Sequence, residues 1–172
     1  LEVEEDGEIR RILYTLTAMV TDAAHDIKRN MEAMETLDVL FAKAKLSAAM
    51  DARAVEFGCE RRIRIREGRH PLLDRESCVP LNFEMGDGVS GVRMTGANTG
   101  GRTGAVKTVG LLSMMAQCGL HIPCGEDSYI AMQDAYWCDI GDGQSISQNL
   151  STFSGHMTNV IHILEQCSRD SL

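Results

Sequence analysis

The stretch TGANTGGRTGAVKT, residues 95–108, decides the fold. It comes close to the phosphate-binding loop pattern, in which a glycine, any four residues and a second glycine precede lysine and then serine or threonine. Gly96 and Gly101 have this spacing and Thr103 occupies the hydroxyl position, but Arg102 replaces the lysine. The stretch is therefore a nucleotide site with a changed cation, an inactive site or a chance glycine-rich turn.

The residues around the loop favour a nucleotide site. Residues 89–94 have the pattern of a short strand, and residues 102–117 have that of a helix ending near Gly119. Glycines let successive backbone N–H groups form an anion cradle, and the dipole of the following helix attracts phosphate. Thr103 offers a hydroxyl to Mg²⁺, whereas Arg102 keeps the positive charge on a longer, planar and forked group.

A second glycine motif competes with this one. Residues 86–91, GDGVSG, match the G-x-G-x-x-G dinucleotide fingerprint, which should follow a strand and open a helix. Here the motif precedes the strand expected at residues 89–94. We therefore interpret it as a glycine-rich turn between two strands.

The rest of the chain predicts a mixed α/β fold with a helical extension. Residues 6–51 carry apolar side chains at helical spacing and predict two packed amphipathic helices that form an arm outside the α/β core. Alternation around Ile63 and Ile65 predicts a strand, and another is expected within residues 129–140. Residues 153–167 predict a further helix.

Composition narrows the class of protein. The chain has 172 residues, 44% of them hydrophobic, which suits one domain with or without an extension. It begins at Leu1 rather than methionine, and we expect a fragment of a larger protein. The net charge of −8 argues against binding of a nucleic-acid backbone by this segment alone.

Cysteine usage and hydropathy indicate the compartment. The six cysteines form no C-x-x-C pair and no zinc spacing, so we expect reduced, partly buried thiols in a cytoplasmic protein. No apolar run approaches the length of a membrane span, and no signal peptide is visible. We therefore expect no contact with a membrane.

Several motifs together resemble the MutS family. Residues 95–123 are similar to its TGPNxGGK-Ser/Thr loop, the helix that ends in a MAQxG-type turn, and the Val/Ile-Pro that follows. Residues 139–157, DIGDGQSISQNLSTFSGHM, resemble DIGDEQSIEQSLSTFSSHM of the branch called here MutS-two. Residues 68–73, GRHPLL, match the entry to the family's ATPase domain, and residues 37–52 resemble its lever helices.

The resemblance implies a fold and a division into domains. The fold would be a truncated P-loop ATPase core of the ABC-like type, preceded by a helical lever. Residues 1–58 would be lever helices, and residues 59–172 the N-terminal part of the ATPase domain. In the family, an aliphatic strand ending in Asp-Glu follows at this point and supplies carboxylates for Mg²⁺ and water, so we expect the isolated chain not to hydrolyse ATP.

The resemblance also assigns residues to ATP and Mg²⁺. Thr103 would bind Mg²⁺, and Cys78 and Val79 would lie beside adenine, although ordinary packing explains Cys78 equally well. Arg102 departs from the family's lysine, so we expect ATP binding with slow hydrolysis. Ala97, Gly104 and Gly143 are further departures. The phosphate cradle would consist of Gly96, Ala97, Asn98, Thr99, Gly100, Gly101, Arg102, Thr103 and Gly104.

Catalytic roles would fall to Arg102 and Ser151. Ser151 begins the family's Ser-Thr-Phe turn, which reaches the partner subunit's γ-phosphate in a MutS dimer; capping of the next helix is the alternative. His70 is expected to fix the turn at Pro71, Lys107 to face solvent or serve structure, and His156 to have a structural role.

For the whole protein, the resemblance implies a homodimeric ATPase linked to mismatch repair and DNA recombination. It would bind branched or mismatched DNA through regions outside this chain and suppress recombination, and it could carry an Smr-type nuclease. The alternatives are a nucleotide-gated clamp with little hydrolysis and an ATPase that splits collided ribosomes. A small-molecule kinase would need a substrate lid, which the sequence does not show.

Overall fold

The computed structural model describes residues 2–95, 101–140 and 149–172. It divides into two compact units, Leu1–Lys45 and Leu46–Leu172. The second unit holds the four-stranded sheet and the candidate site. Whether the functional boundary between lever and ATPase segments falls at residue 58 stays a prediction.

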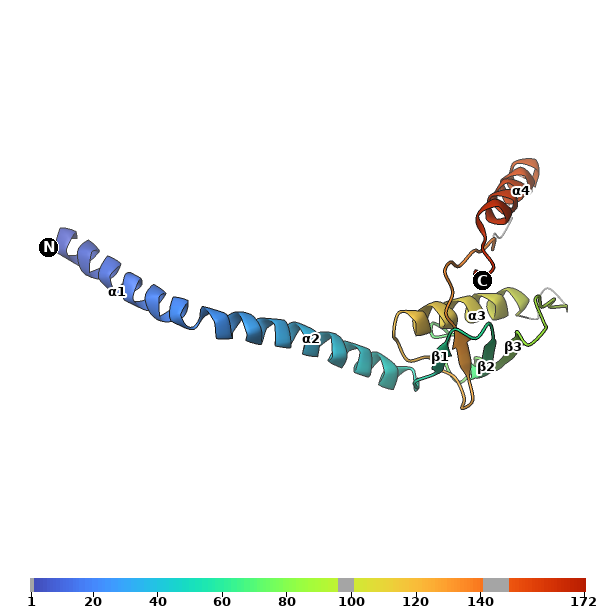
Figure 1. The fold of residues 1–172 in the computed structure, drawn as a ribbon, viewed down its shortest axis with the longest axis horizontal. Helices are drawn as coiled ribbons and strands as arrows, with labels where there is room; N and C mark the ends of the chain where they lie inside the picture. Colours follow the sequence, from blue (N-terminus) through green and yellow to red (C-terminus); the bar gives the residue numbers. More distant parts are fainter. Residues whose placement is uncertain (1, 96–100, 141–148) are drawn as a thin grey trace. The chain divides into compact units, whose positions relative to one another are not determined.

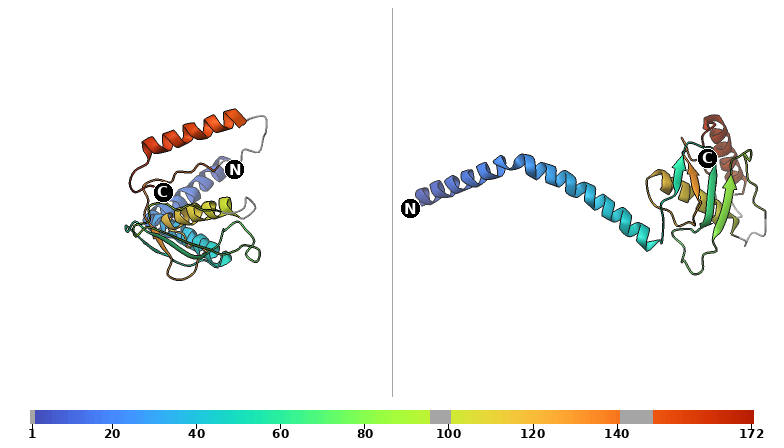
Figure 2. Two further views of the ribbon diagram at one scale, coloured as in Figure 1. Left: turned by 90° about the vertical axis from the view of Figure 1, so that its right-hand side faces the viewer. Right: turned by 60° about the horizontal axis from the view of Figure 1, so that its bottom comes forward.

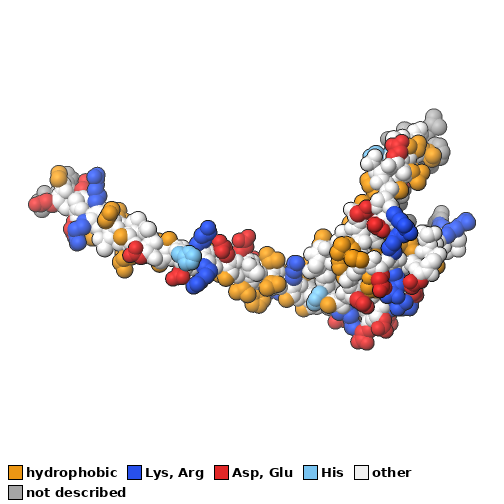
Figure 3. Space-filling view, in the orientation of Figure 1, with side chains coloured by type: hydrophobic (Ala, Val, Ile, Leu, Met, Phe, Trp, Pro, Cys, Tyr) orange, Lys and Arg blue, Asp and Glu red, His pale blue; other side chains and the backbone are white. Residues whose placement is uncertain are grey.

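The first unit is a helical arm. It contains α1 (Glu2–Asp22) and most of α2 (Ala24–Ala49), which follow one another end to end at Ala23. The expectation that the two helices pack together is wrong, because one intervening residue is too short to reverse the chain. Their large apolar side chains stay exposed, as Figure 3 shows; among them are Ile9, Leu13, Met34, Leu40 and Phe41.

A four-stranded mixed sheet organises the second unit, in the order β1-β4-β2-β3. The strands are β1 (Glu56–Gly58), β2 (Ile63–Gly68), β3 (Leu81–Met85) and β4 (Tyr129–Ala131). β1 and β4 are parallel, whereas β2 runs antiparallel to both β3 and β4. The strands expected around Ile63 and within residues 129–140 are confirmed, and so is a mixed α/β fold.

Alternation along β2 decides which face of the sheet is covered. Ile63 and Ile65 are 1% and 0% exposed and belong to the core that α3 (Arg102–Gln117) completes. The intervening Arg64 and Arg66 instead bind Glu84 of β3, at 3.0 and 3.3 Å. Figures 1 and 2 show α3 lying across the face of the sheet.

The ends of α3 agree with the prediction. The amide of Gly119 donates to the carbonyl of Ala116 at 2.9 Å, and the amide of Leu120 donates to that of Met115 at 3.0 Å. This is a Schellman motif, in which the residue after the helix adopts a left-handed conformation that glycine tolerates best; Gly119 has φ 70°. The helix therefore ends for the reason that the sequence indicated.

The strand predicted at residues 89–94 is wrong. Val89 forms a single bridge, back to Gly86 across a tight turn, and residues 90–95 have no regular secondary structure. A strand needs a hydrogen-bonding partner as well as suitable side chains, and in the described part of the chain β3 pairs with β2 alone. The G-x-G-x-x-G motif is a turn, as predicted, but it does not join two strands.

The last residues of the chain return to the segment that follows β4. The helix α4 (Asn149–Gln166) begins a few residues earlier than the predicted start at residue 153. Beyond it, the amide of Asp134 donates to the carbonyl of Asp170, and the amide of Leu172 donates to that of Ala135. Trp137 donates to the carbonyl of Leu172 at 2.7 Å. Residues 134–137 are thereby fixed alongside residues 170–172.

Two further expectations concern cysteines and membranes. All six cysteines are free, but Cys59, Cys118, Cys138 and Cys167 are exposed, so the expectation of partly buried thiols holds only for Cys78 and Cys124. Burial raises the pKa of the Cys124 thiol. None of the helices in the described residues is long and apolar enough to cross a membrane.

Candidate nucleotide-binding site

A cavity of about 1100 Å³ opens along one face of α3. The helix contributes residues at intervals of three and four, so they form one continuous stripe. The other walls come from the end of β3, from residues 92–94 and from residues 136–140. The α3 residues that line the cavity are Arg102, Thr103, Val106, Lys107, Val109, Gly110, Leu111 and Met114.

The N-terminus of α3 is suited to an anion. Gly101, the N-cap residue, makes no side-chain capping bond, and the first turn contains no acidic residue. Backbone N–H groups of a first helical turn that lack a cap, together with the helix dipole, form a site for negative charge. Arg102 and Thr103 stand at this end and line the cavity. The predicted cradle residues 96–100 lie outside the described residues.

The charges around the cavity also favour an anion. Among the described residues that line it, Arg102 and Lys107 are permanent cations and Asp139 is the acidic side chain, beside the titratable His70, Tyr136 and Cys138. Small-molecule pockets usually measure about 300–1,000 Å³, so this one has room for a nucleotide. No group of three or more histidine, cysteine or acidic residues that could hold a metal occurs in the described residues.

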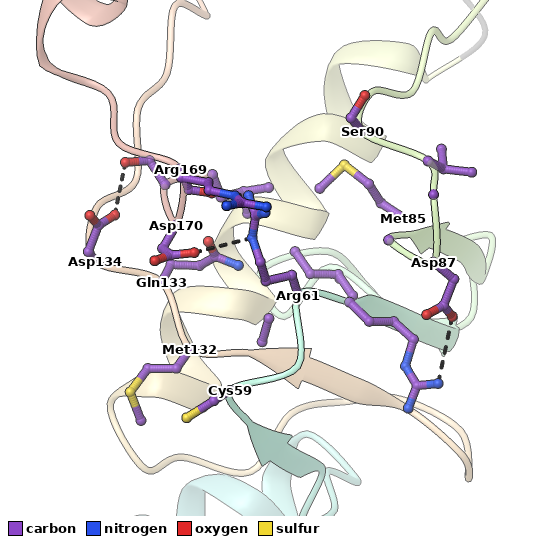
Figure 4. A pocket seen from close by; sticks show the side chains of 18 residues that line it. Cys59, Arg61, Met85, Asp87, Ser90, Met132, Gln133, Asp134, Arg169 and Asp170 are labelled. Atoms are coloured by element: carbon purple, nitrogen blue, oxygen red, sulfur yellow. Dashed lines mark hydrogen bonds and ion pairs between the residues drawn. The ribbon is translucent and has the colours of Figure 1, made fainter.

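A second cavity, of about 690 Å³, is lined by three arginines and three aspartates (Figure 4). Arg61 pairs with Asp170 at 3.2 Å, and Arg62 lies 3.8 Å from Asp87. Opposite charges in equal number, two pairs of which are in contact, give little attraction for a polyphosphate. The cavity at α3 is therefore the better candidate for a nucleotide.

The structure gives Cys78 and Val79 no place in the cavity at α3. Val79 is 84% exposed, and Cys78 is half-buried in the loop between β2 and β3. Arg69 holds this loop, because its Nη1 donates to the carbonyls of Arg75 and Cys78 at 3.1 and 2.9 Å. Ordinary loop packing thus accounts for Cys78 as it stands, and a position beside adenine stays a prediction for both residues.

His70, which does line the cavity, has the structural role that the sequence indicated. Its Nδ1 accepts a hydrogen bond from the amide of Leu72 at 3.3 Å, across the turn that contains Pro71. Lys107 is exposed, as expected.

Sequence reasoning missed a group of side chains in which His156 and Asn159 of α4 contact Asp139, a residue that lines the cavity. Nδ1 of His156 lies 2.9 and 3.0 Å from the two carboxylate oxygens of Asp139, and Nδ2 of Asn159 donates to Asp139 at 3.1 Å. Hydrogen bonds from His156 and then from Asn159 lower the pKa of Asp139. The structural role expected for His156 therefore has a named partner. Their spacing places His156 and Asn159 on one face of a helix, but it does not indicate Asp139 as their partner.

Ser151 lies in the first turn of α4, because the helix begins at Asn149. It therefore does not head the helix as the sequence suggested, and the N-cap position lies before it. Its predicted contact with the partner subunit's γ-phosphate remains compatible with a place near a helix N-terminus.

The comparisons with known proteins fit this arrangement. A family model described as MutS domain V matches residues 92–172, which contain α3, α4 and most of the cavity wall. The chain belongs to the MutS family. It is 45% identical over 172 residues to endonuclease MutS2 of Brevibacillus brevis and 44% identical over 172 residues to that of Agathobacter rectalis. Endonuclease MutS2 of Bacillus velezensis is 45% identical over 171 residues.

These matches confirm the predicted relationship to the MutS family and its MutS-two branch. They cover 99–100% of this chain but only 22% of each relative, so the chain spans about a fifth of the relatives it matches. The names of the relatives identify them as endonucleases. The activity, substrates and partners of a whole protein that contains this segment are therefore matters for proposal.

Proposed function

We propose that this chain is the ATP-binding part of a MutS-two-type ATPase with a P-loop core. The observation that carries the proposal is the position of the 96–103 motif. It leads directly into the N-terminus of α3, where Gly101 provides no side-chain cap and Arg102 and Thr103 face a cavity large enough for a nucleotide. Membership of the MutS family supports the same function.

The residues present fit ATP with Mg²⁺. Backbone N–H groups at the start of α3 and the Arg102 guanidinium would hold the phosphates, and the hydroxyl of Thr103 would be a ligand for Mg²⁺. Bound Mg²⁺ would neutralise charge on the phosphate oxygens. The apolar wall formed by Val106, Leu111 and Met114 would keep water from the rest of the nucleotide.

For the whole protein we propose a cytoplasmic homodimer that acts on branched or mismatched DNA and suppresses recombination. Ser151 would act on the nucleotide of the partner subunit. The net charge of −8 supports DNA contact through other regions of the protein.

A second candidate, a nucleotide-gated clamp with little hydrolysis, is favoured by Arg102. A phosphate-binding loop fits a slender ammonium closely, whereas a guanidinium prefers to contact two oxygens at once. Misplacement by about 1 Å can reduce a rate on the order of a hundredfold. The two candidates share the binding site and differ in turnover. Ribosome splitting is a further candidate for the whole protein, distinguished by its target.

Single-turnover ATP hydrolysis by a protein that contains the complete ATPase domain tests the proposal. We expect slow hydrolysis, abolished by Thr103→Ala and accelerated by Arg102→Lys more than ATP binding is tightened. Arg93→Ala removes an exposed cation that does not line the cavity; it is the matched control and should retain hydrolysis. Equal rates for the wild type and for Thr103→Ala would contradict the proposal.

The role of Ser151 between subunits needs a mixed dimer. Ser151→Arg and Thr103→Ala each inactivate one half of a shared site, so a mixed dimer has one site with both lesions and one with neither. Mixing two inactive proteins should restore part of the ATPase activity. No recovery in verified heterodimers would contradict a role between subunits.

A further inference from the structure

Residues 136–140 have two sides with different neighbours. On one side, Tyr136, Trp137, Cys138, Asp139 and Ile140 line the cavity at α3. On the other side, the same segment carries the side-chain contacts to α4. Nucleotide in the cavity and the position of α4 therefore depend on one short stretch of backbone.

The contacts to α4 come from three positions one helical turn apart. His156 and Asn159 both bind the carboxylate of Asp139. Nδ2 of Asn159 also lies 3.4 Å from the carbonyl of Cys138. The ring of His162 meets that of Trp137 edge to face, with centroids 5.8 Å apart. The group formed by Asp139, His156 and Asn159 is called the α4 latch below.

Apolar packing does not replace these contacts. Among the described side chains of α4, Met157, Ile161 and Leu164 are 43%, 51% and 70% exposed and Val160 and Ile163 are half-buried, so none of these apolar groups is fully buried. Burial at this level contributes much less than the 1.5–3 kcal/mol expected, roughly, for a fully buried aliphatic side chain. The position of α4 thus depends on the polar latch and on the chain that follows the helix.

The residues just before this segment are held firmly. Gln117, at the end of α3, donates to the carbonyl of Gln133 at 2.7 Å and accepts from the amide of Gln133 at 3.0 Å. The hydroxyl of Tyr136 also donates to Gln117, at 3.0 Å. Asp134 accepts hydrogen bonds from Ser168 and Ser171 beyond the end of α4. The amide of Trp137 is bound to the carbonyl of Leu172 as well, so movement caused by a ligand is directed to residues 138–140.

We propose that the α4 latch couples occupancy of the nucleotide cavity to the position of α4. The inference rests on the proposed nucleotide function and makes His156 and Asn159 positioning residues, because neither lines the cavity. A ligand that contacts Trp137 or Asp139 shifts the backbone to which the latch is attached. The N-terminal turn of α4, which contains Ser151, moves with it.

Hydrogen exchange of α4 amides, measured on the 172-residue chain with and without Mg-ATP, tests the coupling. Nucleotide binding is followed separately by the anisotropy of a fluorescent ATP analogue. In the wild type, ATP should change exchange at residues 154–166 by about fivefold or more, the lower end of typical coupling between sites. His156→Ala should abolish this change and still bind the analogue, with an affinity altered by no more than the same factor, because coupling is reciprocal.

Two further variants separate coupling from simple destabilisation. Glu165→Gln removes a charge from an exposed position on α4 and should leave the ATP response intact. The reciprocal exchange Asp139→His with His156→Asp keeps one carboxylate facing one imidazole and should restore a response that each single substitution removes. Circular dichroism and the emission of Trp137 establish that each variant is folded.

The outcomes distinguish the coupling from the nucleotide function itself. If the wild type binds the analogue and α4 exchange stays unchanged, or if His156→Ala responds as the wild type does, the coupling is overturned and the nucleotide site stands. If the wild type fails to bind the analogue, the proposed function is overturned together with the coupling. Restoration by the reciprocal exchange, with loss in both single variants, supports the latch.

Discussion

The helices α3 and α4 have similar lengths, 16 and 18 residues, but they are held in place by different forces. On α3, Val109, Leu112 and Ala116 are at most 8% exposed and pack against the sheet. On α4, none of the apolar side chains that the structure describes is fully buried, and a carboxylate, an imidazole and an amide make the hydrogen bonds. A helix fixed by apolar packing can present a constant phosphate site, whereas one held by a few polar groups can be repositioned.

The largest effect on stability should come from truncating an apolar side chain of α3 that packs against the sheet. Leu112 is fully buried, so Leu112→Ala should lower the free energy of unfolding of the α/β unit by about 2–5 kcal/mol. Leu164→Ala, at a position 70% exposed on α4, should change it by no more than about 0.5 kcal/mol. Urea unfolding followed by the single tryptophan, Trp137, measures both. Equal losses in the two variants would contradict the contrast between the helices.

Acid should release α4 before it disrupts α3. The pKa of Asp139 is lowered by His156 and then by Asn159, so the carboxylate is favoured while the latch is closed. Its contribution is complete above the ordinary carboxyl range and is lost as the pH falls through the lowered pKa. We therefore expect exchange protection of α4 to fall at acid pH while that of α3 persists.

Asp134 complicates this titration and requires a control. Hydrogen bonds from Ser168 and then from Ser171 lower its pKa as well, and it holds the chain that follows α4. In Asp139→Asn the acid-dependent step assigned to the latch should disappear, and any step that remains belongs to Asp134. If the exchange protection of α4 depends on pH in Asp139→Asn as it does in the wild type, Asp139 is not the group that releases α4 in acid.

The smallest effects should come from glycines within α3. A methyl group added at Gly104 or Gly110 meets no described atom within 4 Å apart from its chain neighbours and the backbone of its own helix. Alanine at either position should therefore stabilise the helix by about 0.5–1 kcal/mol. Thermal unfolding measures this gain. Gly104 belongs to the predicted phosphate cradle, whereas Gly110 lies about 9 Å further along the helix axis. Only Gly104→Ala should therefore weaken ATP binding. Equal ATP affinities of the Gly104→Ala and Gly110→Ala variants would contradict a place for Gly104 in the phosphate cradle.

Local signals in the sequence predicted α3 and its ends, because helical spacing, the preceding glycine and Gly119 act within a few residues. The strand expected at residues 89–94 failed because pairing depends on partners distant in the chain. The packing predicted between the two helices of the arm was wrong for a related reason. Apolar spacing predicts a helix and its apolar face, but it does not identify what covers that face.

In the candidate site, too, the sequence predicted the residues of a local motif and missed a contact between residues distant in the chain. Arg102 and Thr103 were placed from one short motif, and the structure sets both on a cavity wall. The partner of His156 is Asp139, 17 residues away, and no local spacing reveals such a pair. Cys78 and Val79 were assigned by resemblance alone, and the loop held by Arg69 leaves them outside the cavity.

Equilibrium binding of Mg-ATP to the 172-residue chain, with Trp137 emission as the signal, tests the central claim most directly. Trp137 lines the same cavity as Arg102 and Thr103, so a nucleotide there should alter its emission. We predict saturable binding that Arg102→Ala weakens by about tenfold or more, the loss of a charge-assisted contact. Arg93→Ala, at an exposed cation outside the cavity, should stay within about twofold. Saturable binding that is unaffected by Arg102→Ala, or no binding at all, would contradict the assignment of the nucleotide site to the N-terminus of α3.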